Sequence, residues 1–213
     1  MDNKTLYIIG AGTYGAAILD LTETIGYEVK GFFDDDLSKK GNRILGVPVL
    51  GKLEDNMSLI KNNQFAIAIG NNDIRLKFAN LIKMNKGILP SLIHPNAEIS
   101  KYSIIGNGCI IHANAFIWTE VELRDYSIIS PSVVIAHHTV VGTASFISAG
   151  SNIGAGINIG MKCFVGIGTT IMTGVKSIGE NCIIGAGSVV IKNVEDNLVV
   201  VGNPAKFLKY NRN

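Results

Sequence analysis

Two adjacent histidines, His137 and His138, are the residues of this chain best suited by type to move protons. Histidine is the most effective general base near neutral pH, because its imidazole readily gains and loses a proton there. Of the other two histidines, His94 precedes a proline and is expected to be structural, and His112 lies well apart in the chain. We expect one member of the adjacent pair to be catalytic; the alternative is a surface pair or a contact between subunits.

A second candidate site lies near the start of the chain, where the apolar run Leu6–Gly10 leads into Gly10-Ala-Gly-Thr-Tyr-Gly15. A helical run follows, and a second apolar strand ends at Asp34–Asp36. This is a βαβ unit that carries GxGxxG, with acidic residues about twenty positions further on. The glycines let backbone approach a ligand, the helix N-terminus favours phosphate, and the carboxylates can accept hydrogen bonds from a ribose or a base.

A third buried strand is predicted over Phe65–Gly70, and helical spacing begins at Ile74, with Asn72 or Asp73 as the N-cap. The intervening run Gly46–Gly51 is typical of an exposed turn or a short edge element.

The carboxyl ends of parallel strands meet at one edge of a sheet, so Gly10, Asp34 and Gly70 should converge on one crevice. A mononucleotide or nucleotide-sugar site is the favoured interpretation. An NAD(P) site is an alternative, although it would need a second half and a catalytic domain. A purely structural turn is the other alternative.

The element that must position the histidines runs from Ile93 to Val194. An aliphatic residue recurs at every sixth position from Ile93 to Ile171, and after a slip of one residue near Ser177 the pattern resumes at Ile178. This period fits neither an α-helix nor an alternating strand. It fits a coil with three flat faces and about eighteen residues per turn, whose aliphatic side chains stack inside. The small or β-branched fifth residue of each hexad should let the chain turn the corner.

This repeat resembles the left-handed parallel β-helix of the hexapeptide-repeat acyltransferases. The tail Val199–Lys206 contains Gly-Asn-Pro-Ala-Lys, which is similar to the closing sequence of acetyl-CoA-dependent members. The resemblance implies that Lys206 meets the phosphates of coenzyme A; a capping turn with a solvated lysine is the alternative.

The whole chain resembles the nucleotide-linked amino-sugar N-acetyltransferases, which are relatives of the sialic acid O-acetyltransferases. The resemblance implies an α/β Rossmann-like nucleotide-sugar domain at residues 1–90 and an all-β left-handed β-helix with a C-terminal tail at 91–213. The segments that carry it are 9–15, 33–35, 68–72, 135–142 and 201–206.

The resemblance also implies roles for individual residues. His137 would be the general base, a backbone N–H near Ala155 would stabilise the oxyanion, and Ile167 and Gly185 would line the acetyl-CoA channel. The residues that would hold the nucleotide-sugar are Gly12, Thr13, Tyr14, Asp34, Asp35 and Gly70.

Three positions depart from the family pattern. The place just after the catalytic histidine, usually acidic, is His138, so either ring could be the base. Phe146 stands where some relatives have a second histidine near the acetyl-CoA thioester, so that cofactor contact is apolar here or is supplied by another residue. Tyr14 stands in the first ligand loop where relatives often have histidine.

The expected enzyme is an acetyl-CoA-dependent N-acetyltransferase of a UDP- or dTDP-linked 4-amino-4,6-dideoxy sugar. It would serve surface polysaccharide synthesis such as that of lipopolysaccharide O-antigen, by direct transfer. The resemblance also implies a homotrimer with sites between subunits. One alternative is O-acetylation of a sialic acid or related sugar. Another is a non-catalytic or metal-binding β-helix that uses His112 with the adjacent pair.

The composition limits which partners and which cellular compartment we expect for this protein. The formal net charge of +2 gives no electrostatic reason for binding nucleic acid or membranes. We expect neither a signal peptide nor a membrane span. The chain has three cysteines, all at the fifth position of a hexad, which favours buried free thiols in a cytoplasmic protein. We expect no metal cofactor.

Overall fold

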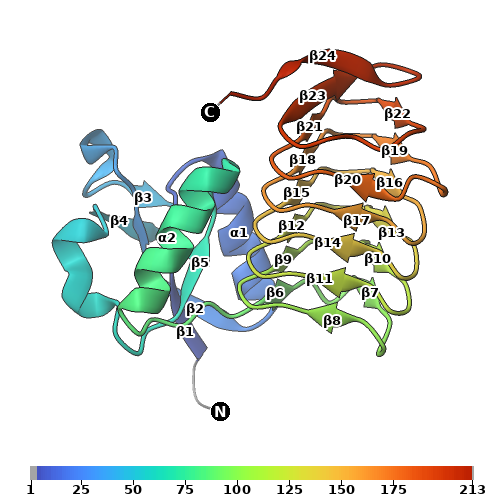
Figure 1. The fold of residues 1–213 in the computed structure, drawn as a ribbon. Coiled ribbons are helices and arrows are strands. Elements are labelled where there is room, and N and C mark those ends of the chain that lie inside the picture. The colour runs from blue at the N-terminus through green and yellow to red at the C-terminus, as the bar shows by residue number, and fades with distance from the viewer. Residues whose placement is uncertain (1–3, 213) are drawn as a thin grey trace. The chain divides into compact units, whose positions relative to one another are not determined.

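The computed structural model describes residues 4–212. The chain divides between Leu92 and Ile93 into two compact units, and each is described here by itself. Figure 1 shows an α/β unit in blue to green and a stack of coils in green to red. No helix in the described part of the chain is both long and apolar enough to cross a membrane.

The N-terminal unit is a five-stranded sheet with the strand order β3-β4-β2-β1-β5. Strands β1, β2, β4 and β5 run parallel, and β3 pairs with β4 as an antiparallel edge hairpin. The strands are β1 (Lys4–Ile9), β2 (Tyr27–Phe33), β3 (Arg43–Ile44), β4 (Val47–Gly51) and β5 (Phe65–Ile67). The helices are α1 (Thr13–Thr24), η1 (Leu37–Lys39), η2 (Glu54–Leu59) and α2 (Asn72–Met84).

Helix α2 begins where the sequence provides a cap and buries one face, whereas α1 follows Gly12 without a side-chain cap. Helix α2 starts after Asn71, whose backbone is extended and whose side-chain oxygen accepts a hydrogen bond from the Ile74 N–H at 3.0 Å. The prediction of Asn72 or Asp73 as the cap was therefore wrong, because the chain enters the helix one residue earlier. The α2 side chains Phe78 and Ile82 are fully buried, which ties the helix to the sheet.

The C-terminal unit is a three-sided coil built mostly from two-residue strands (Figure 1). One face has the order β22-β19-β16-β13-β10-β7, the second β20-β17-β14-β11-β8, and the third β24-β23-β21-β18-β15-β12-β9-β6.

Apart from β23 and β24 at the C-terminal end, the strands are short because each covers the last residue of one hexad and the first of the next. On the first face they are β7 (Glu98–Ile99), β10 (Phe116–Ile117), β13 (Val134–Ile135), β16 (Asn152–Ile153), β19 (Thr170–Ile171) and β22 (Val189–Val190). On the second face they are β8 (Ile104–Ile105), β11 (Glu122–Leu123), β14 (Val140–Val141), β17 (Asn158–Ile159) and β20 (Ser177–Ile178). On the third face they are β6 (Leu92–Ile93), β9 (Ile110–Ile111), β12 (Ile128–Ile129), β15 (Phe146–Ile147), β18 (Phe164–Val165), β21 (Ile183–Ile184), β23 (Leu198–Val201) and β24 (Lys206–Tyr210).

Parallel pairing stacks each hexad on the one a full turn away. Ile117 pairs with Ile135, and Ile135 with Ile153, and all three are at most 2% exposed. Burial of one such side chain contributes about 1.5–3 kcal/mol, so the column forms the core of this unit. One extra residue enters between β19 and β20, where Thr173 bridges Val175, and the ladder resumes as Asn158 with Ser177.

The corners differ from the expectation that the small fifth residue makes the turn. The backbone turns at the fourth position, where non-glycine residues such as Asn181 and Tyr126 adopt φ between +54° and +63°. The fifth residue is buried and ties the coils together. Ser145 Oγ donates to the Gly160 carbonyl at 2.9 Å and accepts from the Cys163 N–H at 3.0 Å. Strand β24 then runs antiparallel to β23 and closes the last coil.

Candidate functional site

The glycine-rich loop follows β1 and is shaped by close backbone packing. Gly10 has φ of +102°, and a Cβ there would lie 2.7 Å from the Ala68 carbonyl oxygen. A Cβ on Gly15 would collide with the Gly10 carbonyl. Gly12, in contrast, is exposed and would have no atom within 4 Å of a Cβ. The first and third glycines therefore pack the loop, while the middle glycine and the adjacent exposed Thr13 stay open to a ligand at the start of α1.

Asp34, at the end of β2, holds this loop in place. Its Oδ2 accepts from the Ala11 N–H at 2.8 Å and from Lys39 Nζ at 2.9 Å, and its Oδ1 accepts from the Asp36 N–H at 2.9 Å. Burial raises the pKa of Asp34, but the hydrogen bonds from Lys39, Asp36 and Ala11 outweigh burial, so the net shift is downward. Asp34 therefore acts on its own chain's loop, and its partner Lys39 was not predicted from the sequence.

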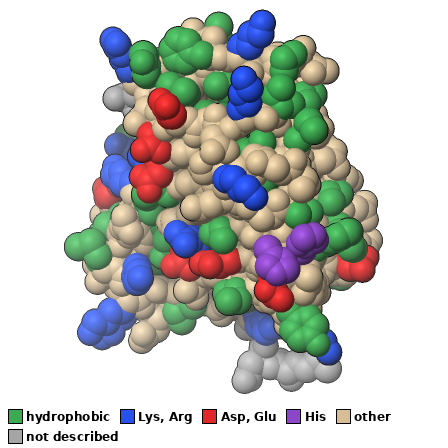
Figure 2. Space-filling model, turned by 45° about the vertical axis from the view of Figure 1, so that its right-hand side comes forward, with side chains coloured by type: hydrophobic (Ala, Val, Ile, Leu, Met, Phe, Trp, Pro, Cys, Tyr) green, Lys and Arg blue, Asp and Glu red, His purple; other side chains and the backbone are tan. Residues whose placement is uncertain are grey.

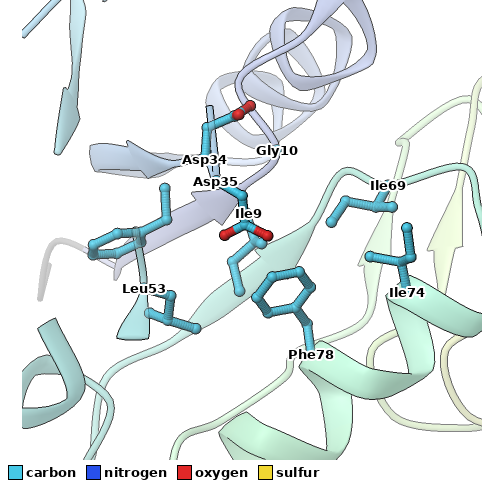
Figure 3. A pocket seen from close by; sticks show the side chains of 9 residues that line it. Ile9, Gly10, Asp34, Asp35, Leu53, Ile69, Ile74 and Phe78 are labelled. Atoms are coloured by element: carbon cyan, nitrogen blue, oxygen red, sulfur yellow. The ribbon is translucent and has the colours of Figure 1, made fainter. Parts of the chain in front are cut away.

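Asp35 belongs to a cavity of about 180 Å³ beside this loop. Figure 3 shows the Asp35 carboxylate among the apolar side chains of the cavity, while the Asp34 carboxylate points toward the Gly10 segment. Asp35 itself is exposed. The cavity is lined mostly by apolar side chains, and Asp35 offers a carboxylate acceptor there. It is lined by Ile9, Gly10, Phe33, Asp34, Asp35, Leu53, Ile69, Ile74 and Phe78.

Gly70 and Tyr14 lie close to a buried arginine that the sequence analysis missed. Arg75, on the first turn of α2, is 1% exposed, and its Nη1 donates to the carbonyls of Ile69 and Gly70 at 3.0 and 3.2 Å. Burial raises the pKa of the Tyr14 hydroxyl, opposed by the charge of Arg75, so this phenol remains a neutral donor. Arg75 thus fixes the loop after β5 from behind.

The adjacent histidines occupy a corner of the β-helix between β13 and β14. His137 Nδ1 lies 3.0 Å from His138 Nδ1, and His138 Nε2 lies 3.1 Å from Glu120 Oε2. The Trp118 ring stacks on the His137 ring with centroids 5.8 Å apart. Figure 2 shows two neighbouring histidine side chains on the surface with an acidic side chain against them. The imidazole of His137 is thus oriented from two sides.

Ala155 lies one coil further along the same corner, directly after His137 in the stack. The Gly156 N–H donates to the His137 carbonyl at 3.0 Å. The Ala155 N–H donates to Thr173 Oγ1 at 3.2 Å. This amide therefore has a partner within the chain, and it would have to leave Thr173 or share its proton to serve as an oxyanion donor.

The other two histidines have structural surroundings. His94 Nδ1 accepts from the Asn96 N–H at 3.0 Å. His112 lies on the third face next to β9, where burial and the charge of His94 lower its pKa to about 4. Neither lies on the corner of His137. Among residues 4–212 no three metal-ligating side chains gather into a possible metal site.

The residues expected at acetyl-CoA lie elsewhere on the coil. Phe146 is on β15, its ring 5.4 Å from that of Phe164, and Ile167 is 60% exposed on the corner after β18. The Gly185 carbonyl accepts from Thr169 Oγ1 at 3.1 Å, and Lys206 is exposed on β24.

Phe146, Gly185 and Lys206 thus share the third face or its immediate continuation. His137 and Ala155 lie on the corner between the first and second faces. In a three-sided prism that corner is opposite the third face. One copy of the chain therefore brings His137 to Ala155 but does not bring either of them to Phe146 or Gly185.

Comparison with known proteins identifies the family to which the chain belongs. The model of the PglD N-terminal domain matches residues 5–82. GDP-perosamine N-acetyltransferase of Escherichia coli is 28% identical over 212 residues, covering 95% of each chain. The structure of PerB from Caulobacter crescentus, in complex with CoA and GDP-perosamine, has a TM-score of 0.89 at 28% identity and covers 98% of this chain and 99% of that one. The acetyltransferase domain of PglB from Neisseria gonorrhoeae has a TM-score of 0.88 at 30% identity and covers 97% and 100%.

Other matches are partial. The chain spans 52% of the length of UDP-N-acetylbacillosamine N-acetyltransferase from Bacillus subtilis, at 30% identity over 112 residues. It spans 24% of an uncharacterized protein of Acanthamoeba polyphaga mimivirus, at 28% identity over 124 residues.

The whole-chain similarity confirms the predicted fold class, an α/β Rossmann-like unit followed by a left-handed parallel β-helix. The resemblance inferred from the sequence is confirmed for both units. The family model covers the N-terminal unit, and the solved structures cover both units. The chain is therefore an enzyme, an acyltransferase, and belongs to the amino-sugar N-acetyltransferases of the hexapeptide-repeat family.

Proposed function

We propose that this enzyme transfers the acetyl group of acetyl-CoA to the amine of a nucleotide-linked 4-amino-4,6-dideoxy sugar, in the synthesis of a surface polysaccharide or glycan. The observation that carries the proposal is the oriented imidazole of His137 on a chain that also has a glycine loop and an Asp35 cavity suited to a nucleotide. Relatives named for perosamine and bacillosamine N-acetylation support the acceptor class.

His137 is the proposed general base. Its Nδ1 is engaged by His138, which leaves Nε2 as the nitrogen that can reach an acceptor. As the sugar nitrogen forms a bond to the thioester carbon, Nε2 takes the amine proton. The C–S bond then breaks, and the coenzyme A thiolate takes that proton from the imidazolium.

Transfer is direct in this proposal. A covalent acyl-enzyme would need an accessible nucleophile, and cysteine is the most effective one among common side chains. Cys109, Cys163 and Cys182 are each 0% exposed, inside the coil. Free thiols also fit a reducing compartment, and we infer a cytoplasmic enzyme on that basis.

The active site is proposed to form between copies in a homotrimer. His137 lies opposite the face that carries Phe146 and Gly185, so one copy cannot supply both sets to one acetyl-CoA. Packing the coils side by side brings the corner of one copy to the third face of another. In this arrangement Ile167, Gly185 and Lys206 line the coenzyme channel against the neighbouring copy's His137.

A thiol-release assay tests the proposal. Purified enzyme is given acetyl-CoA with UDP-, dTDP- or GDP-linked 4-amino sugars, or with sialic acid. Relatives are named for GDP- and UDP-linked sugars, so both nucleotides belong in the panel beside dTDP. We expect turnover with at least one nucleotide-linked amino sugar and an N-acetyl product by mass spectrometry. Turnover with sialic acid alone would contradict the proposal and favour O-acetylation.

A further inference from the structure

Glu120 lies where stacking of the coils brings it onto His138. Both residues occupy the fourth position of their hexads, and both have left-handed backbone, with φ of +56° and +59°. Strands β10 and β13, which precede them, pair in register, and the His138 N–H donates to the Thr119 carbonyl at 3.2 Å. The corner is therefore fixed by backbone bonds that do not depend on either side chain.

The side chains form a continuous series of polar contacts. Glu120 Oε2 lies 3.1 Å from His138 Nε2, and His138 Nδ1 lies 3.0 Å from His137 Nδ1. The two imidazole rings are nearly perpendicular, at 86°, which points a nitrogen of one at a nitrogen of the other. The Trp118 ring stacks on the His137 ring and limits its rotation.

Matching donors to acceptors allows one arrangement for two neutral rings. A carboxylate only accepts hydrogen bonds, so His138 Nε2 must carry a proton toward Glu120. Neutral His138 then has a lone pair on Nδ1, and His137 Nδ1 must carry the proton between the rings. That tautomer leaves a lone pair on His137 Nε2, the nitrogen a general base requires.

We propose that Glu120 and His138 are positioning residues that act in series on His137, together replacing the single acidic partner that the sequence lacks after His137. This inference rests on the proposed function for its effect on rate. Glu120 sets the tautomer of His138, His138 sets that of His137, and the carboxylate stabilises the positive charge that the amine proton brings. Glu120 gains no proton in the cycle, because His137 returns the amine proton to the thiolate.

The exposure of the two side chains determines whether their contact should affect folding stability or kcat. The Glu120 and His138 side chains are 62% and 57% exposed, and a hydrogen bond or ion pair between side chains this exposed contributes little to folding. Loss of the carboxylate should therefore leave folding stability almost unchanged. Its effect should fall on kcat, because the charge on the imidazole exists only while the reaction proceeds.

Glu120→Gln tests the charge with the shape kept. We expect kcat to fall about tenfold while KM for both substrates stays within about twofold. Glu122→Gln is the matched control, because Glu122 pairs with Arg124 two residues further along and should leave kcat unchanged. A Glu120→Gln enzyme with wild-type kcat, or one whose loss lies only in KM, would overturn the inference.

A double-mutant cycle tests whether the two residues act in series. In a His138→Ala background the link from Glu120 to His137 is broken, so Glu120→Gln should cause no further fall in kcat. Independent effects that multiply would contradict the series.

The tautomer can be measured without turnover. In ¹⁵N-labelled free enzyme we expect an imidazole ¹⁵N NMR spectrum with His137 protonated at Nδ1 and bare at Nε2, and with His138 protonated at Nε2. The reverse tautomer on His137 would overturn the inference even if the enzyme acetylates amino sugars. The expected tautomer in an enzyme without turnover on any amino sugar would leave the inference standing and reject the proposed function instead.

Discussion

Asp34 and Asp35, which directly follow β2, have different partners, although they are adjacent residues of the same type. Asp34 is bound by donors of its own chain, from the glycine loop and from Lys39. Asp35 is exposed at the cavity. The first therefore acts mainly on the structure of the loop, and the second is free to contact a ligand.

Asp34→Asn should destabilise the protein in a pH-dependent way. The folded-state pKa of Asp34 lies below its ordinary value of about 3.9, so its stabilising effect is present above that pH and is lost as pH falls through the folded-state pKa. We expect a loss of about 1–2 kcal/mol at pH 7, from weaker charge-assisted hydrogen bonds. Urea melts of both proteins should converge as the pH falls below the folded-state pKa of Asp34. A difference that persists unchanged at that pH would contradict this role.

Asp35→Asn should weaken binding of the nucleotide-sugar and leave the chemistry intact. A lost carboxylate contact should raise KM for the sugar nucleotide about tenfold, with kcat and KM for acetyl-CoA little changed. Asp20→Asn, an exposed position on α1, is the matched control. An unchanged KM for Asp35→Asn would exclude this carboxylate from the substrate site.

Residue types identified part of the site, but not the contacts between its parts. The adjacent histidines and the glycine pattern are visible in the sequence because each is a local signal. Glu120, Lys39 and Arg75 were missed because their partners are set by the fold: a full coil separates Glu120 from His138, and a helix turn aims Arg75 at the loop after β5. For Glu120 the sequence did hold one signal: it lies one coil, eighteen residues, before His138.

At the level of elements, the hexad period predicts the coil because every turn repeats the same environment. The aliphatic first position stacks as expected. The role of the fifth position was predicted less well, since its hydroxyls bond carbonyls in the next coil rather than forming the turn. Propensity alone does not reveal a hydrogen bond that exists only after stacking.

Ser145→Ala should therefore cost stability out of proportion to its size. It leaves the Cys163 N–H and the Gly160 carbonyl without the Ser145 hydroxyl, inside the coil, at a cost of about 1–3 kcal/mol. Ser145→Cys should cost less, because a thiol at the same position of a later coil, Cys163, approaches the Gly179 carbonyl at 2.9 Å. Chemical denaturation measures both, with exposed Ser132→Ala as control; equal stability of all variants would contradict this role for the hydroxyl.

At the level of the whole molecule, the proposed site requires two copies. The sequence period predicts three faces, and the strand pairing shows which residues lie on each face. His137 lies at the corner between the first and second faces, whereas Phe146 and Gly185 lie on the third. This separation is the reason for placing the site between subunits.

Subunit complementation tests this arrangement. His137→Asn and Ile167→Glu should each inactivate, the second by placing charge in the coenzyme channel. Mixed trimers unfolded and reassembled from equal amounts should regain about a quarter of wild-type activity, because some interfaces join an intact His137 to an intact Ile167. Complete inactivity of verified mixed trimers would show that both residues act within one copy.

The proposed role of His137 as general base is tested most directly by kcat of His137→Asn, measured with acetyl-CoA and the nucleotide-linked amino sugar that the wild-type enzyme acetylates. We expect kcat to fall by about 10²–10⁴ with substrate KM values little changed, because the base acts on the transferred proton. Retention of most of kcat by this variant would contradict it.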